Sequence, residues 1–132
     1  MNGKKFLMTF VGSLVVMWLL SGLWHVLIMG DYYSKRQAIA EPNMLFIILA
    51  YAILALLMTY IFPQGYKGGA PLKEGLRFGA TMGLLWILPL GVIMHAVQGT
   101  SGKLILIDSL WHVVEQGVGG IVIAYIYGLK KA

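Results

Sequence analysis

Cysteine is absent from this chain of 132 residues, and charged residues are scarce. The lack of cysteine excludes a disulfide, a thiolate metal site and a cysteine nucleophile. Only 11% of the residues are charged and 59% are hydrophobic, whereas soluble proteins carry about 25% charged residues. A soluble domain of this size could not bury so much apolar surface. The composition therefore indicates a membrane protein.

Several motifs of enzymes are also missing. The chain has no glycine-rich phosphate-binding loop, no nucleophile elbow and no H-E-x-x-H zinc motif. Ser109 lies three residues before His112, but no oxyanion-stabilising motif accompanies the pair. We therefore expect no catalytic residue and no enzymatic activity.

Four long apolar runs fill most of the chain, at residues 6–29, 44–62, 76–97 and 104–129. A bilayer core of roughly 30 Å requires about 20 helical residues, so each run is a predicted transmembrane helix. The first run is longer than the roughly 7–15 apolar residues of a signal peptide, and we expect it to be retained. The segment Pro63-Gln64-Gly65 is expected to end the second helix and Pro42 to begin it. Residues 1–132 then form a single transmembrane domain.

Lysine and arginine predict the orientation of these spans. Seven basic residues fall on one side of the membrane, namely Lys4, Lys5, Lys67, Lys73, Arg77, Lys130 and Lys131. Three fall on the other side, namely Lys35, Arg36 and Lys103. Because the cytoplasmic side carries the excess of positive charge, we expect an all-α, antiparallel bundle of four transmembrane helices with both termini in the cytoplasm. The basic residues lie at the ends of the spans, where the same rule places them. The net charge of +5 therefore does not indicate nucleic-acid binding.

Small residues recur at intervals of four in the third and fourth runs. They are Gly75, Gly79 and Gly83 in the third run, and Gly120 and Ala124 in the fourth, with Gly117 beside them. Small side chains let membrane helices approach closely. The spacing predicts a close contact between these two helices, or between one of them and a partner subunit.

Polar side chains inside the spans are few and lie at similar depths. Asp108, His112 and Glu115 follow i, i+4, i+7 spacing and share one helix face. Counted from the outer ends at about 1.5 Å per residue, His95 lies ~3 Å deep, His25 and Asp108 ~6 Å, His112 ~12 Å and Glu115 ~16 Å. Intramembrane polar groups usually face the bundle interior. The pattern predicts one polar site in the outer half of the membrane.

This site admits several chemistries. His25, His95, Asp108 and His112 could bind a transition metal, and two of the three histidines could ligate a haem iron. Asp108, His112 and Glu115 could instead move protons. Hydrogen bonding between helices, with no ligand at all, is the structural alternative.

Three local motifs resemble those of the small four-helix bacterial membrane proteins classed as domains of unknown function. They are Gly22-Leu23-Trp24-His25, then Glu74-Gly75 with Phe78-Gly79, and then Gly117 with Gly119-Gly120. The resemblance implies a four-helix fold and the bacterial cytoplasmic membrane, but no activity. A separate feature is the tetrapeptide Leu-Trp-His-Val, which occurs at residues 23–26 and again at 110–113.

The functional hypotheses follow from the small size of the protein and from how little of it lies outside the predicted spans. We expect an accessory or structural subunit, in contact with the lipid bilayer and with other membrane subunits or a second copy of itself. The alternatives are a metal- or haem-binding redox protein and a channel or transporter for protons or a small solute. A transporter more often has interrupted helices in corresponding halves, whereas here Pro89 alone interrupts a span.

Overall fold

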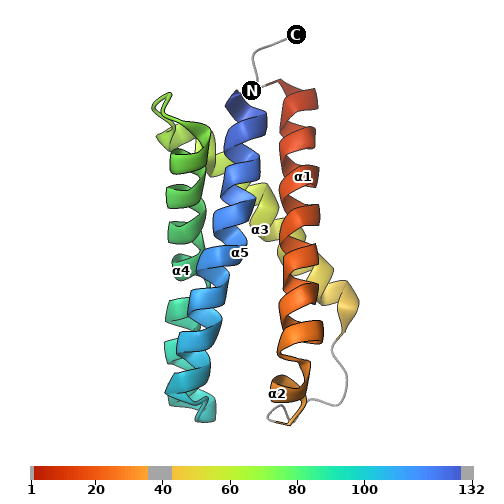
Figure 1. Ribbon diagram of the computed structural model, residues 1–132, viewed down its shortest axis with the longest axis vertical. Coiled ribbons are helices and arrows are strands. Elements are labelled where there is room, and N and C mark those ends of the chain that lie inside the picture. Colours follow the sequence, from red (N-terminus) through yellow and green to blue (C-terminus); the bar gives the residue numbers. More distant parts are fainter. Residues whose placement is uncertain (1, 36–42, 129–132) are drawn as a thin grey trace.

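The computed structural model describes residues 2–35 and 43–128, and every regular element within these ranges is helical. The elements are α1 (Gly3–Gly22), the π-helix η1 (Leu23–Ile28), α2 (Gly30–Ser34), α3 (Met44–Gly65), α4 (Pro71–Gln98) and α5 (Gly102–Gly128). In Figure 1, the short α2 lies at the opposite end of the molecule from the start of α1. The all-helical class predicted from the sequence is confirmed.

Three of the long segments are long and apolar enough to cross a membrane. They are Gly3–Ile28, Met44–Gly65 and Pro71–Gln98. The fourth long helix, α5, has 27 residues but is not among them, because Asp108, His112, Glu115 and Gln116 interrupt its apolar sequence. The described chain thus has three candidate membrane spans and a fourth helix of similar length.

The helix ends follow local sequence signals. Asn2 and Asn43 cap α1 and α3 with their side-chain oxygens, as expected of asparagine at a helix start. Gly99 ends α4 in the left-handed conformation, at φ 70°, which glycine adopts without a steric penalty. The helix α3 ends at Gly65, within the segment Pro63-Gln64-Gly65 that was expected to end it, although the apolar run itself stops at Phe62. The prediction for Pro42 lies outside the described residues.

The helix α5 contacts each of the other three long helices. It lies beside α4 over most of its length, and α1 lies along its other side, while α3 crosses behind them at an angle (Figure 1). The start of α1 and the end of α5 lie at the same end of the molecule (Figure 1). The helix that carries Asp108, His112, Glu115 and Gln116 is also the one with the most buried residues among the four long helices.

The contact between α4 and α5 depends on glycine. A Cβ atom on Gly75 would lie 2.6 Å from the Cα atom of Ile121, and one on Gly79 would overlap the carbonyl group of Gln116. A Cβ atom on Gly120 would likewise overlap the backbone of Gly75. The two backbones approach so closely that these positions have no room for a side chain.

Gly83, Gly117 and Ala124 complete the row of small residues. Gly83 faces the carbonyl group of His112. Gly117 faces Leu76 of α4, and Ala124 is fully buried. All six small residues singled out in the sequence are thus buried inside the helix group.

A cluster of buried apolar side chains fills the space between α1, α3 and α5. It consists of Met17, Leu54, Ala55, Met58, Phe62, Ile123 and Ala124. We call this cluster, together with the glycine contact of α4 and α5, the packed half of the molecule. Two buried hydroxyls in it donate to carbonyl groups of their own helix, Thr9 to Lys5 and Ser13 to Phe10.

Candidate functional site

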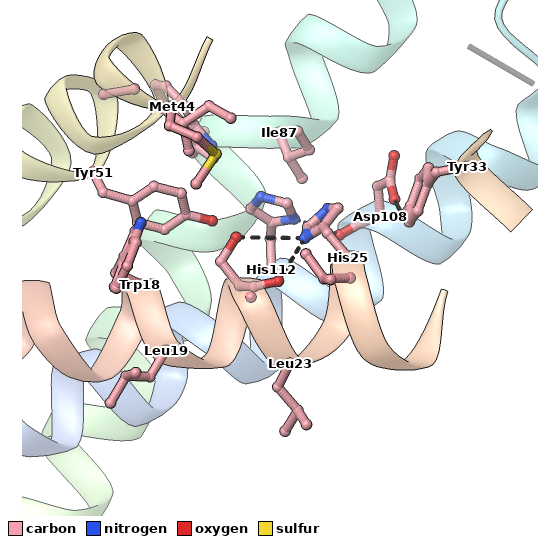
Figure 2. A pocket seen from close by; sticks show the side chains of 16 residues that line it. Trp18, Leu19, Leu23, His25, Tyr33, Met44, Tyr51, Ile87, Asp108 and His112 are labelled. Carbon is pink, nitrogen blue, oxygen red and sulfur yellow. Dashed lines mark hydrogen bonds between the residues drawn. The ribbon is translucent and has the colours of Figure 1, made fainter. Parts of the chain in front are cut away.

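A cavity of about 750 Å³ lies at the α2 end of the molecule. Its walls come from α1, η1, α2, α3, α4 and α5, and most of them are aliphatic or aromatic. His25, Tyr33, Tyr51, Asp108 and His112 supply polar atoms to this wall (Figure 2). Volume and lining are typical of a site for a small molecule. We call this region the cavity half.

The π-helix η1 positions His25 in the cavity wall. Its wider turn is seen in the bond from the N–H of Met29 to the carbonyl of Trp24, at 2.8 Å. The imidazole Nδ1 of His25 lies 3.1 Å from the Ser21 carbonyl oxygen, the acceptor that a regular α-helix would use for the His25 N–H. This side-chain bond competes with the regular backbone bond. Short π-helical segments of this kind occur frequently at functional sites.

The two cavity histidines are held in the same way. The Nδ1 of His112 lies 2.8 Å from the carbonyl oxygen of Asp108, just as that of His25 lies against Ser21. A carbonyl only accepts hydrogen bonds, so Nδ1 carries the proton in each neutral ring and Nε2 carries a lone pair. The ring centroids are 6.3 Å apart. The cavity is therefore lined by two imidazoles with unprotonated Nε2 atoms.

A hydrogen-bonded chain closes the α2 end of the cavity. The hydroxyl of Tyr33 donates to a carboxylate oxygen of Asp108 and accepts from the indole N–H of Trp24, at 3.3 Å. Burial, together with the hydrogen bond to Asp108, raises the pKa of Tyr33 above its ordinary value. The hydroxyl therefore remains a donor at neutral pH and ties α2 to α5.

A second network lies deeper, around Glu115. This residue is fully buried, and its two carboxyl oxygens accept from the indole N–H of Trp111 at 3.0 Å and from the amide of Gln116 at 2.7 Å. Tyr51 directs its hydroxyl towards the same carboxyl group. Trp111 also stacks on Trp24, with ring centroids 4.5 Å apart. The two networks are thus linked through a pair of tryptophans.

The structure brings together some of the residues that the sequence singled out and separates others. His25, Asp108 and His112 line the cavity, and Glu115 lies beside it. His95 does not line it: its exposed ring bonds through Nδ1 to the carbonyl of Thr100, at 2.7 Å, at the end of α4. Within residues 2–35 and 43–128, no three histidine, aspartate or glutamate side chains are grouped to hold a metal ion.

The histidine pair His25 and His112 offers two nitrogen ligands that could hold a haem iron, with ring centroids 6.3 Å apart. Beside this pair, Trp24 of η1 stacks on Trp111 of α5.

Sequence reasoning missed Tyr33, Tyr51 and the tryptophan pair as members of this site. One signal for the tryptophans was present, the repeated tetrapeptide Leu-Trp-His-Val. In the structure its two copies face each other: tryptophan stacks on tryptophan, and the two histidine rings meet edge to face. Tyr33 and Tyr51 had no comparable signal.

Comparisons with known proteins were negative: no family model matches the chain, and neither a curated protein nor a solved structure matches it. The site must therefore be interpreted from its own geometry.

Proposed function

We propose that this chain is an integral membrane protein whose four long helices cross the bilayer in alternating directions, with both termini in the cytoplasm. The seven-to-three distribution of basic residues supports this orientation. With 27 residues, α5 extends roughly 40 Å, enough for a core of about 30 Å. Its polar residues His112, Glu115 and Gln116 are buried among the other helices, so they would not meet lipid. The bacterial cytoplasmic membrane is the proposed location.

Reporter fusions test this topology. A reporter fused after Lys131 should be active in the cytoplasm, and one inserted beside Lys35 should be active outside. The reverse result would refute the orientation. Opposite locations for a fusion before Lys4 and one after Lys131 would refute the even number of spans.

Within that topology we propose that the protein binds a small molecule with an apolar body and a polar head. A single observation supports this function, the cavity of about 750 Å³ with polar side chains at an otherwise apolar wall. Hydrogen bonding between helices alone would need no space between them. Here His25 and His112 both keep an Nε2 atom without a hydrogen-bond partner among the described residues, on the wall of that space.

Tryptophan fluorescence offers a direct test. Trp18 and Trp86 line the cavity, and Trp24 and Trp111 belong to the hydrogen-bond networks of Tyr33 and Glu115 beside it. We would titrate the protein in lipid nanodiscs with four non-fluorescent probes that share a cyclohexylmethyl body and carry an amine, a trimethylammonium, a hydroxyl or a carboxylate. At least one probe should produce a saturable change in the fluorescence.

A pair of variants distinguishes cavity binding from partition into lipid. Ala50 lines the cavity, and Ala50→Phe should abolish the saturable change by occupying the space. Leu49 neighbours it on α3 but is exposed on the outer surface, so Leu49→Phe should leave binding intact. If no probe gives a signal that depends on position 50, the proposed function is wrong.

The accessory-subunit and haem hypotheses stay predictions. The exposed apolar side chains of α3 would suit lipid and a partner subunit equally well. Purification in mild detergent tests for a copurifying protein, and an absorption spectrum of the same sample tests for haem. Proton transfer likewise stays a prediction for Asp108, His112 and Glu115.

A further inference from the structure

The polar atoms of the cavity share one property, because most of them accept hydrogen bonds. His25 and His112 each present the Nε2 lone pair, since each Nδ1 proton is directed at a backbone carbonyl. His112 is only 6% exposed, so a donor for its Nε2 atom would have to come from the cavity that it lines. A ligand that complements this wall must supply donors.

The charge of the cavity is also one-sided. The Oδ1 atom of Asp108 accepts a hydrogen bond from the Tyr33 hydroxyl, and no hydrogen-bond partner is seen for Oδ2 among the described residues. Among the described residues that line the cavity there is no lysine or arginine. A carboxylate in an apolar environment is costly unless it is paired. A cation in the cavity would therefore stabilise the Asp108 carboxylate.

The aromatic side chains elsewhere on the cavity wall are suited to the same kind of ligand. Trp18, Trp86 and Tyr51 line the cavity together with Tyr33, and aromatic faces attract cations that lie within about 6 Å of the ring centre. Figure 2 shows Asp108, Tyr33 and the two histidines on one side of the space, with Trp18 and Tyr51 on the other. Aliphatic side chains such as Leu19, Leu23 and Ile87 form the rest.

From these observations we propose that the cavity binds a protonated primary amine with an apolar body. The ammonium group would donate to the free oxygen of Asp108 and to the Nε2 atoms of His25 and His112. The centroids of the two rings lie 6.3 Å apart, so the proposed ammonium group would lie beside two neighbouring imidazoles. The apolar body would occupy the aromatic and aliphatic wall. This inference rests on the proposed function, since it names the ligand class of the same cavity.

The four cyclohexylmethyl probes test the inference through the order of their binding affinities. The amine should bind at least roughly tenfold more tightly than the alcohol, because a charge-assisted hydrogen bond is about twice as strong as a neutral one. It should exceed the trimethylammonium probe by a similar factor, because that cation has no N–H donor. The carboxylate probe should bind most weakly of the four.

Variants test whether Asp108 and His25 cause the preference for the amine over the alcohol. Asp108→Asn should weaken amine binding at least roughly tenfold and leave the alcohol within about twofold, whereas Asp31→Asn, at an exposed position of α2, should change neither. His25→Gln, at a partly exposed position, provides a second measurement if Asp108→Asn does not fold, and it should weaken the amine selectively.

Each contrary result has a distinct meaning. Equal binding of amine and alcohol, or tighter binding of the carboxylate, would overturn the amine proposal while the cavity remained a binding site. Equal binding of amine and trimethylammonium would overturn the role of the N–H donors and, with it, the proposal. The absence of any signal that depends on position 50 would overturn both this inference and the proposed function.

Discussion

The packed half and the cavity half of this molecule are built from the same helices in opposite ways. In the packed half, glycines bring the backbones of α4 and α5 into contact, and Met17, Met58 and Phe62 fill the remaining space. In the cavity half, the same helices carry bulky aromatic and imidazole side chains and leave about 750 Å³ between them. Close packing at one end therefore accompanies open space at the other.

This difference has an energetic interpretation. Helices in lipid have no hydrophobic drive to associate, so contacts between small residues stabilise the assembly. Glycine rows provide that stability in the packed half, and they allow the cavity half to remain incompletely filled. Four sets of substitutions, each with a control or a paired variant, sharpen or break the comparison. All are measured as the free energy of unfolding during titration with sodium dodecyl sulfate in mixed micelles.

The largest effect is expected for Gly79→Val. Its side chain would overlap the Gln116 carbonyl, and α5 would have to move away, at a cost of about 3 kcal/mol or more. The control is Gly22→Ala, because a Cβ atom there would meet nothing within 4 Å; its effect should stay within about 1 kcal/mol. Equal effects at the two positions would show that the glycine contact does not stabilise the fold.

Next comes the same substitution at two places on α3. Ala55 is fully buried in the packed half, so Ala55→Phe should destabilise the protein by about 1–3 kcal/mol through overpacking. Ala50 lines the cavity, and Ala50→Phe should cost much less because the ring enters existing space. A cost at Ala50 as large as that at Ala55 would mean that the cavity is not open.

An effect of similar size is expected for Glu115→Ala, at the boundary between the halves. It removes the acceptor of Trp111 and Gln116 and leaves two buried donors unpaired, at a cost of about 1–3 kcal/mol. Glu115→Gln keeps one carbonyl acceptor and should cost less. If Glu115→Ala is as stable as the unsubstituted chain, the network does not hold α5 in place.

The smallest effect belongs to Tyr33→Phe. The substitution removes the hydrogen bond to Asp108 and keeps the ring that stacks on His25 at 5.1 Å, so we expect a loss of about 1 kcal/mol. Tyr60→Phe, at an exposed position of α3, is the matched control and should be neutral. A neutral Tyr33→Phe would mean that α2 is not tied to α5 through this bond.

The helical membrane class follows from the sequence alone. Composition and the lengths of four apolar runs predicted an all-helical protein, and the described helices agree with the runs to within about five residues at each end. The spacing of Gly75, Gly79 and Gly83 also singled out one face of α4. These features are local, because length and periodicity act within a single helix.

Tertiary structure alone decided which side chains meet. Nothing in the order of residues indicated that Tyr33 would reach Asp108 across 75 positions, or that His95 would bond to Thr100 outside the cavity. The direction in which His25 points from the helix axis depends on the π-helix η1, within which its Nδ1 atom lies 3.1 Å from the Ser21 carbonyl oxygen. The physical reason is that an apolar helix in lipid is nearly indifferent to rotation about its axis, so its orientation is set by the neighbours against which it packs.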